Sequence, residues 1–139
     1  MKTAFIFGLG YVGMPLAHAL AKKGWQIRGT TRTPSKLAGK IGVGWEILPF
    51  AADSPLANPK KVFADVDVII STITAIGGSD PVLDLHGKDL ESFSGWAGYV
   101  SATSVYPDMP NRICYEDTPV APSTARGRAR VLAESRWQN

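Results

Sequence analysis

Three glycines near the start of the chain, in the stretch FIFGLGYVGMPLA, have the type and spacing that bind a diphosphate. They form the pattern G-x-G-x-x-G directly after an apolar segment. In such a pattern the first glycine permits a tight turn, the second lets the backbone approach the pyrophosphate, and the third lets helix and strand pack closely. A glycine-rich turn without a ligand is the alternative. The predicted diphosphate-binding residues are Gly8, Leu9, Gly10, Tyr11, Val12 and Gly13.

The residues that follow the second predicted strand bear on the choice between NAD and NADP. An acidic residue roughly 20 positions after the glycines would bind the ribose hydroxyls of NAD. This chain has Thr31 there, followed by Arg32, and a guanidinium suits a 2′-phosphate. We therefore expect NADP rather than NAD, with Ser71 and Thr72 as further cofactor-binding residues. The alternative is that Arg28 and Arg32 form only a solvated basic edge.

A second stretch whose residues could take part in binding or catalysis is ARGRARVLAESRW, near the end of the sequence. It has a helical composition. It contains four arginines, and a guanidinium stays protonated, so it binds anions rather than exchanging protons at neutral pH. A solvated helix face is the alternative interpretation. The four residues are Arg126, Arg128, Arg130 and Arg136.

Composition limits the class of protein. The 139 residues, 45% hydrophobic, suffice for one folded domain over residues 1–139. No apolar stretch approaches the roughly 20 residues of a membrane helix, and no secretory signal is expected. The single cysteine, Cys114, excludes an internal disulfide and fits a cytoplasmic location. The excess of 15 basic over 12 acidic residues is too weak to indicate nucleic-acid binding. No metal site is expected.

The elements that must position these residues alternate along the chain. Such an alternation predicts a parallel sheet covered on both faces: a three-layer αβα, doubly wound, Rossmann-type α/β fold of about five strands. Its ligand is expected beyond the carboxyl ends of the strands, where the strand order reverses. Strands are predicted at residues 3–7, 25–30, 45–50, 65–73 and from 98 to about 103, and helices or turns at 12–22, 34–40, 59–64, 80–90 and from an N-cap at Ser123.

Two family resemblances compete. GLGYVGMPLA resembles the opening of UDP-sugar 6-dehydrogenases, but those enzymes keep an acidic residue where this chain has Thr31. The second resemblance spans almost the whole chain, through GTTR, GSDPVLDLHGKDL, YVSATSVYPD and EDTPVAPSTARGRARVLAE. These stretches resemble an atypical extended group of short-chain dehydrogenases/reductases, described as NAD(P)-dependent epimerase/dehydratase-like. The resemblance is to the dinucleotide-binding part of the group, and we expect no counterpart of its substrate domain within these residues.

The second resemblance implies a catalytic set that this chain lacks as such. Members of the group carry a Ser or Thr after strand five and a Tyr-x-x-x-Lys on the next helix. In them the tyrosine exchanges a proton with the substrate oxygen, the lysine lowers the pKa of the tyrosine, and the Ser or Thr hydroxyl orients the substrate. Counting along this sequence puts Arg126 at the tyrosine position and Arg130 at the lysine position. Ser101 and Thr103 flank the hydroxyl position, and Tyr106 supplies a nearby phenol. These five residues are the catalytic candidates.

These features favour an NADP-binding relative of oxidoreductases and nucleotide-sugar epimerases/dehydratases, acting on a phosphorylated or nucleotide-linked small molecule. The alternative is a non-catalytic module that senses NADP and binds a protein partner. A UDP-sugar 6-dehydrogenase-like domain is the second alternative. An uncovered fifth strand or last helix would expose apolar surface, so we expect a homo-oligomer.

Overall fold

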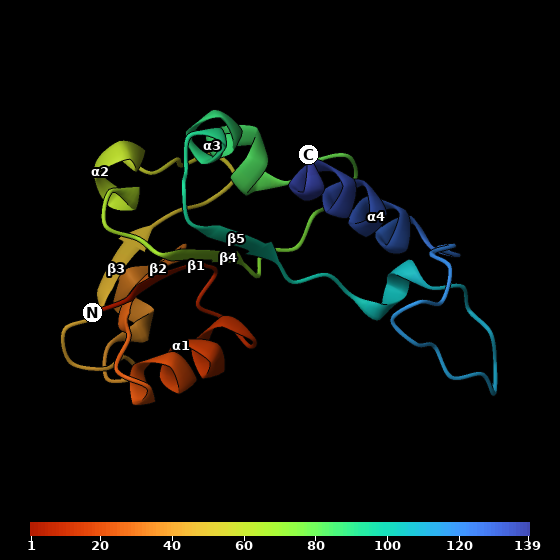
Figure 1. Cartoon of the computed structure of the whole chain (residues 1–139), viewed down its shortest axis with the longest axis horizontal. Helices are drawn as coiled ribbons and strands as arrows, with labels where there is room; N and C mark the ends of the chain where they lie inside the picture. The colour runs from red at the N-terminus through yellow and green to blue at the C-terminus, as the bar shows by residue number, and fades with distance from the viewer.

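The computed structural model describes all residues from Met1 to Asn139. Five strands form one parallel sheet in the order β3-β2-β1-β4-β5, which confirms the predicted Rossmann-type fold (Figure 1). The order reverses between β1 and β4, because the chain builds outward from β1 to β3 and then returns to the other side. The strands are β1 (Thr3–Phe7), β2 (Gln26–Thr31), β3 (Glu46–Pro49), β4 (Val68–Ser71) and β5 (Trp96–Tyr99).

Helices cover both faces of the sheet. In Figure 1, α1 lies on one face, and α2, α3 and α4 lie on the other. This division follows from right-handed crossovers made in opposite directions from β1. None of the helices is long and apolar enough to cross a membrane. They are α1 (Gly13–Lys22), the 3₁₀ helix η1 (Pro34–Leu37), α2 (Pro59–Phe63), α3 (Pro81–Glu91), the 3₁₀ helix η2 (Thr103–Val105) and α4 (Ala125–Gln138).

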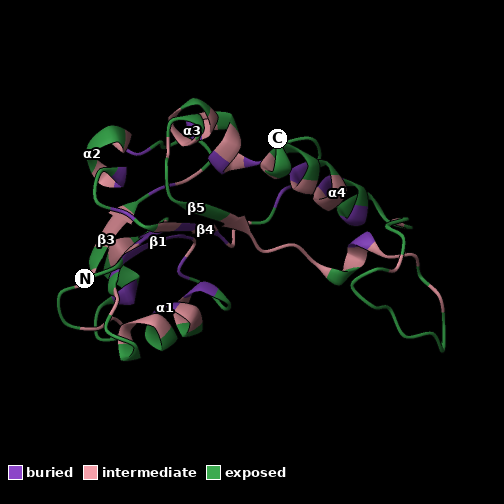
Figure 2. Ribbon diagram, viewed as in Figure 1, coloured by how far each residue is buried: buried purple, intermediate pink, exposed green.

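The central strand β1 supplies both halves of the core. All five of its residues are buried, as the continuous apolar run predicts for a strand covered on both sides (Figure 2). Side chains alternate between the faces: Phe5 and Phe7 pack with the aromatic and aliphatic residues beneath α2 and α3, and Ala4 and Ile6 pack against α1. This rigid strand fixes the position of the glycine loop that follows it.

Three predicted boundaries are wrong at the level of individual residues. The fourth strand is limited to Val68–Ser71, because its ladder with β1 extends only that far. The fifth strand is Trp96–Tyr99, set by pairing with β4 rather than by its own composition. The N-cap of the last helix is Thr124, whose hydroxyl accepts a hydrogen bond from the Gly127 amide at 3.0 Å, whereas the Ser123 hydroxyl accepts one from the Asp108 amide.

Side-chain contacts attach α4 to α3. Asp80, 1% exposed, caps α3 by accepting from the amides of Val82 and Leu83, and its second oxygen accepts from Trp137 Nε1 at 2.8 Å. Arg136 pairs with Asp84 at 2.7 Å. These contacts fix the C-terminal end of α4 beside α3, and its N-terminal end extends beyond the carboxyl ends of the strands (Figure 1).

Asp84, through its hydrogen bond with Ser79 and its pair with Arg136, makes stability depend on pH. The hydrogen bond from the Ser79 hydroxyl holds the pKa of Asp84 below its ordinary value of 3.8; partial burial opposes this shift, and Arg136 adds to it. A depressed carboxylate pKa stabilises the fold above the unfolded-state pKa, and this stabilisation is lost as pH falls through the folded-state pKa. Because both side chains are about 40% exposed, the effect is below about 1 kcal/mol.

We expect Asp84→Asn to lower the melting temperature by about 2 °C at pH 7, and the difference to disappear as pH falls below about 4. Thermal melts across this range check the prediction. Asp53→Asn serves as the control, since Asp53 is exposed and forms no ion pair. A difference between wild type and Asp84→Asn that stays constant with pH would contradict the assignment.

The outer edge of the sheet is exposed. Trp96 of β5 is 61% exposed, and Leu132 of α4 is 55% exposed. The apolar exposure expected of the fifth strand and last helix is thus present. Association of two chains through these exposed side chains stays a prediction.

Candidate functional site

The glycine loop lies at the carboxyl end of β1, where the strand order reverses. It connects β1 to α1 and lies beside the ends of β2 and β4, the two neighbours of β1 in the sheet. In doubly wound folds this position receives a dinucleotide, because helix N-termini and strand ends meet there and leave a crevice. The sequence pattern and the topology therefore indicate the same place.

Two threonines from neighbouring strands hold Gly8 in place. The Gly8 amide donates to Thr30 Oγ1 of β2 at 3.0 Å, and Thr72 Oγ1, just after β4, donates to the Gly8 carbonyl at 2.6 Å. Gly8 has φ +91°, a conformation that favours glycine, and a Cβ there would lie 2.7 Å from Thr72 Oγ1. Sequence reasoning missed Thr30, which is fully buried, because its contact depends on the pairing of β2 with β1.

Four consecutive amides in the loop have no partner within the protein. The N–H groups of residues 10 to 13 form no hydrogen bond, whereas the Leu9 amide is bonded to the Thr30 carbonyl and the Met14 amide to the Gly10 carbonyl. They lie at the N-terminus of α1, where the helix dipole is positive. A row of free amides at a helix N-terminus is a site for a phosphate anion.

The glycines differ in what a side chain would meet. A Cβ on Gly10 would find nothing within 4 Å, so the protein itself imposes no need for glycine there. A Cβ on Gly13 would overlap the Gly8 carbonyl oxygen, so this glycine allows the helix to approach the loop. A Cβ on Gly29 would lie 2.6 Å from Leu9 Cδ1, so Gly29 makes room for the buried Leu9. The open space at Gly10 is the part of the loop available to a ligand.

The predicted ribose-recognition residues lie at the carboxyl end of β2. Thr31 is the last residue of β2 and is half-buried, and Arg32 follows it, exposed and without a hydrogen bond or ion pair. Arg28 is not part of a solvated edge: its Nε pairs with Glu46 at 2.9 Å and its Nη1 donates to the Val62 carbonyl at 3.0 Å. Of the two arginines, only Arg32 is free to meet a ligand.

Ser71 and Thr72 differ in position although they are adjacent. Thr72 contacts the glycine loop directly. Ser71 is fully buried within β4, and its hydroxyl accepts a hydrogen bond from the Ile73 amide at 3.4 Å. Any contribution of the Ser71 side chain to cofactor binding would therefore be indirect.

Arg130 connects α4 to the ends of β4 and β5. Its Nη1 donates to the Tyr99 hydroxyl at 2.9 Å and to the Val100 carbonyl at 3.0 Å, and its Nη2 donates to Thr74 Oγ1 at 3.1 Å. Burial raises the pKa of Tyr99 above its ordinary value of 10.0, although the charge and hydrogen bond of Arg130 partly oppose this. Tyr99 therefore keeps its proton at neutral pH, and Arg130 contributes by positioning α4.

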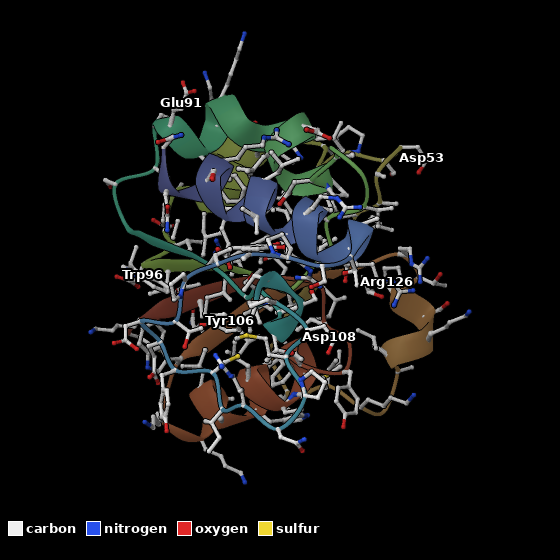
Figure 3. All side chains as sticks on the ribbon, turned by 90° about the vertical axis from the view of Figure 1, so that its right-hand side faces the viewer. Asp53, Glu91, Trp96, Tyr106, Asp108 and Arg126 are labelled. Carbon is white, nitrogen blue, oxygen red and sulfur yellow. The ribbon has the colours of Figure 1, made fainter.

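The other catalytic candidates follow β5 in the chain or lie at the N-terminal end of α4, and Figure 1 shows η2 and this end of α4 beyond the end of β5. The Ser101 hydroxyl oxygen is buried without a hydrogen-bond partner, a costly arrangement for a polar group. Thr103 is exposed at the start of η2, and Tyr106 follows η2, half-buried. Arg126 is exposed at the N-terminal end of α4. Figure 3 looks onto the carboxyl ends of the strands and shows Arg126 in projection on the side of α4 toward α1 and η1, and Figure 1 shows that this end of α4 extends beyond them.

Comparisons with known proteins agree with this geometry. Residues 2–116 match the family described as the NAD binding domain of 6-phosphogluconate dehydrogenase. The chain is similar to the protein YeeZ of Escherichia coli K12, with 32% identity over 144 residues, covering 96% of this chain and 52% of YeeZ. It thus spans about half the length of that relative.

Solved structures have the same fold. A functionally unknown conserved protein from Silicibacter pomeroyi superposes with a TM-score of 0.81 and 34% identity, over 99% of this chain and 49% of that one. UDP-glucose 4-epimerase from Bifidobacterium longum, in complex with NAD+ and UDP, gives a TM-score of 0.75 and 16% identity, over 99% of this chain and 48% of the epimerase. The second likeness is one of fold.

Proposed function

This chain belongs to the family of the NAD binding domain of 6-phosphogluconate dehydrogenase. We propose that it binds a nicotinamide dinucleotide, and that it prefers NADP to NAD because Thr31 and Arg32 stand where NAD-binding chains have an acidic residue. We further propose that it is the coenzyme-binding part of an oxidoreductase or of a nucleotide-sugar epimerase/dehydratase relative. The epimerase that shares its fold is described with NAD+ and UDP, which supports a phosphorylated or nucleotide-linked substrate. We also propose that the chain is related to the atypical extended short-chain dehydrogenases/reductases, which its longer motifs resemble.

The observation that carries this proposal is the state of the glycine loop. Residues 10 to 13 present four free amides, and Gly10 leaves open the space that a side chain would fill. The residues present therefore fit a pyrophosphate bound through backbone N–H groups. Thr30 and Thr72 hold the loop in this conformation through Gly8, so little ordering is needed when the ligand binds.

The strands on either side of the loop would bind the two halves of the dinucleotide. Arg32, at the end of β2, would pair with the 2′-phosphate of the adenosine half. The nicotinamide half would then lie over the ends of β4 and β5, beside Thr74 and Ser101. When bound, the nicotinamide supplies hydride transfer, and the protein supplies binding and orientation.

Replacing Arg32 with glutamine is the direct test of NADP preference. We expect the affinity for NADPH to fall about 30-fold, because a hydrogen-bonded ion pair to a phosphate is lost. The affinity for NADH is expected to change less than about 2-fold, since NADH has no 2′-phosphate. Fluorescence titration of both reduced coenzymes measures these dissociation constants.

Arg128→Gln is the matched control, because Arg128 carries the same charge, is exposed and lies on α4 away from β2. It is expected to leave both affinities unchanged. Tighter binding of NADH than of NADPH by the wild-type protein would refute the preference, and binding of neither would refute the proposed function.

A non-catalytic NADP sensor is the second candidate. It is favoured by two arginines, Arg126 and Arg130. They stand at the positions where short-chain dehydrogenases/reductases have their tyrosine and lysine. Arginine does not exchange a proton at neutral pH. Assays of hydride transfer from NADPH to a panel of carbonyl compounds and nucleotide sugars separate the candidates: turnover identifies an enzyme, and coenzyme binding without turnover identifies a sensor.

A further inference from the structure

The four arginines of α4 fall into two pairs with different surroundings. Arg130 and Arg136 are bonded to protein groups: Arg130 to Tyr99, Val100 and Thr74, and Arg136 to Asp84. Arg126 and Arg128 are exposed, and neither takes part in any of the three ion pairs or in a side-chain hydrogen bond. The first pair attaches the helix to the strand ends and to α3. The second pair forms no side-chain hydrogen bond or ion pair within this chain.

The position of Arg130 fixes where Arg126 lies. The guanidinium of Arg130 spans the carboxyl ends of β4 and β5, through Thr74 on one side and Val100 on the other. Arg126 precedes it by four residues, so it lies on the same side of α4 and about 6 Å along the helix axis toward the N-terminal end. Arg128 lies about 200° around the helix from Arg126 and so points away. Arg126 therefore lies on the same side of α4 as Arg130, one turn farther from the ends of β4 and β5.

The proposed cofactor position would place the substrate on the side of the nicotinamide that faces α4, which carries Arg126. With the adenosine half at the end of β2, the nicotinamide half lies over β4 and β5, and whatever reacts with it lies on the outer side, toward α4. Figure 3 shows Arg126 in projection on the side of α4 toward α1 and η1. At the same strand end, the Ser101 hydroxyl is the one buried side-chain polar atom without a partner.

We propose that Arg126 binds an oxyanion of the substrate, so that the substrate is a small molecule carrying a phosphate or a carboxylate. This inference rests on the proposed cofactor function. A guanidinium presents two parallel N–H donors that match the two oxygens of either group. The positive end of α4, whose first residue is Ala125, adds to the attraction. Arg126 thus acts as a substrate-binding residue at the position where short-chain dehydrogenases/reductases have the acid–base tyrosine.

The test uses the protein saturated with NADPH, so that the glycine loop and Arg32 are already occupied. Inorganic phosphate, UDP and malonate are then titrated separately, and binding is followed by calorimetry and by the fluorescence of bound NADPH. We expect at least one of the three anions to bind. Binding of malonate indicates a carboxylate substrate, and binding of phosphate or UDP without malonate indicates a phosphorylated one.

Three variants identify the binding residue. Arg126→Gln is expected to weaken binding of that anion by about 10-fold or more, whereas Arg128→Gln changes it less than about 2-fold. Arg126→Lys is expected to restore part of the affinity, since lysine keeps the charge but not the planar pair of donors. Because Arg126 has no partner in the protein, all three variants should melt at the wild-type temperature.

The outcomes separate this inference from the proposed function. If NADPH binds and none of the anions does, or if Arg126→Gln and Arg128→Gln weaken the anion equally, the role of Arg126 is refuted and the cofactor function stands. Failure of NADPH to bind would refute both.

Discussion

Alanine at Gly13 is expected to destabilise the protein by about 3 kcal/mol, which lowers the melting temperature by about 10 °C. The added Cβ would overlap the Gly8 carbonyl oxygen and would also lie 3.3 Å from Ile6 Cγ2. Neither neighbour can move easily, because Gly8 is held by Thr30 and Thr72, and Ile6 lies in the central strand. The helix must therefore shift away from the loop. Thermal and denaturant unfolding measure the loss.

Gly87→Ala is the matched control for this prediction. Gly87 also lies in a helix, α3, and a Cβ there meets nothing within 4 Å. Alanine in a helix interior is favoured over glycine, so this variant is expected to be more stable by about 0.5–1 kcal/mol. Opposite signs for the two substitutions identify packing, rather than helix propensity, as the cause. A Gly13→Ala protein as stable as wild type would contradict the close approach of helix and loop.

Alanine at Gly10 is expected to have the opposite profile, with unchanged folding and much weaker coenzyme binding. Gly10 has no positive φ, and a Cβ there meets no protein atom within 4 Å, so the melting temperature of the free protein should stay within about 2 °C. The methyl group would instead occupy the space beside the free amides, where the pyrophosphate must approach. We expect the affinity for NADPH to fall about 100-fold, as hydrogen bonds to a charged group are lost.

Calorimetric titration of NADPH into wild type, Gly10→Ala and Gly87→Ala measures this effect. The Gly87→Ala variant is expected to bind as tightly as wild type, because Gly87 lies within α3 and a Cβ there meets no protein atom within 4 Å. Unchanged affinity in Gly10→Ala would mean that the dinucleotide does not approach the loop at this residue. Together with Gly13→Ala, the experiment separates the glycine that the fold requires from the glycine that the ligand requires.

The short resemblance to UDP-sugar 6-dehydrogenases and the longer one to the atypical short-chain group differ in what they imply for Arg126. The first assigns no role to the end of this chain. The second assigns the positions of Arg126 and Arg130 to catalysis, and the structure places these two residues in different surroundings, one exposed and one bonded at a strand end. Their roles at a ligand are therefore tested separately, by the variants described above.

Local pattern in the sequence determined the first β-α unit. The apolar run of residues 3–7, the G-x-G-x-x-G spacing and the helical periodicity after Val12 each depend on neighbours within a few residues. They correctly predicted β1, the loop and α1, because a buried strand, a tight turn and an amphipathic helix are encoded over short distances. The alternation of such units also gave the parallel sheet and its two covered faces.

Only the tertiary structure decided the contacts between residues far apart in the chain. Thr30 reaches Gly8 because β2 pairs with β1, and Asp80 binds Trp137, 57 positions away, because α4 packs beside α3. Four arginines that look equivalent in one helical stretch become two that are bonded and two that are free. Which guanidinium finds a partner depends on how α4 packs against α3 and the ends of β4 and β5. This docking is set by long-range packing that a single helix does not encode.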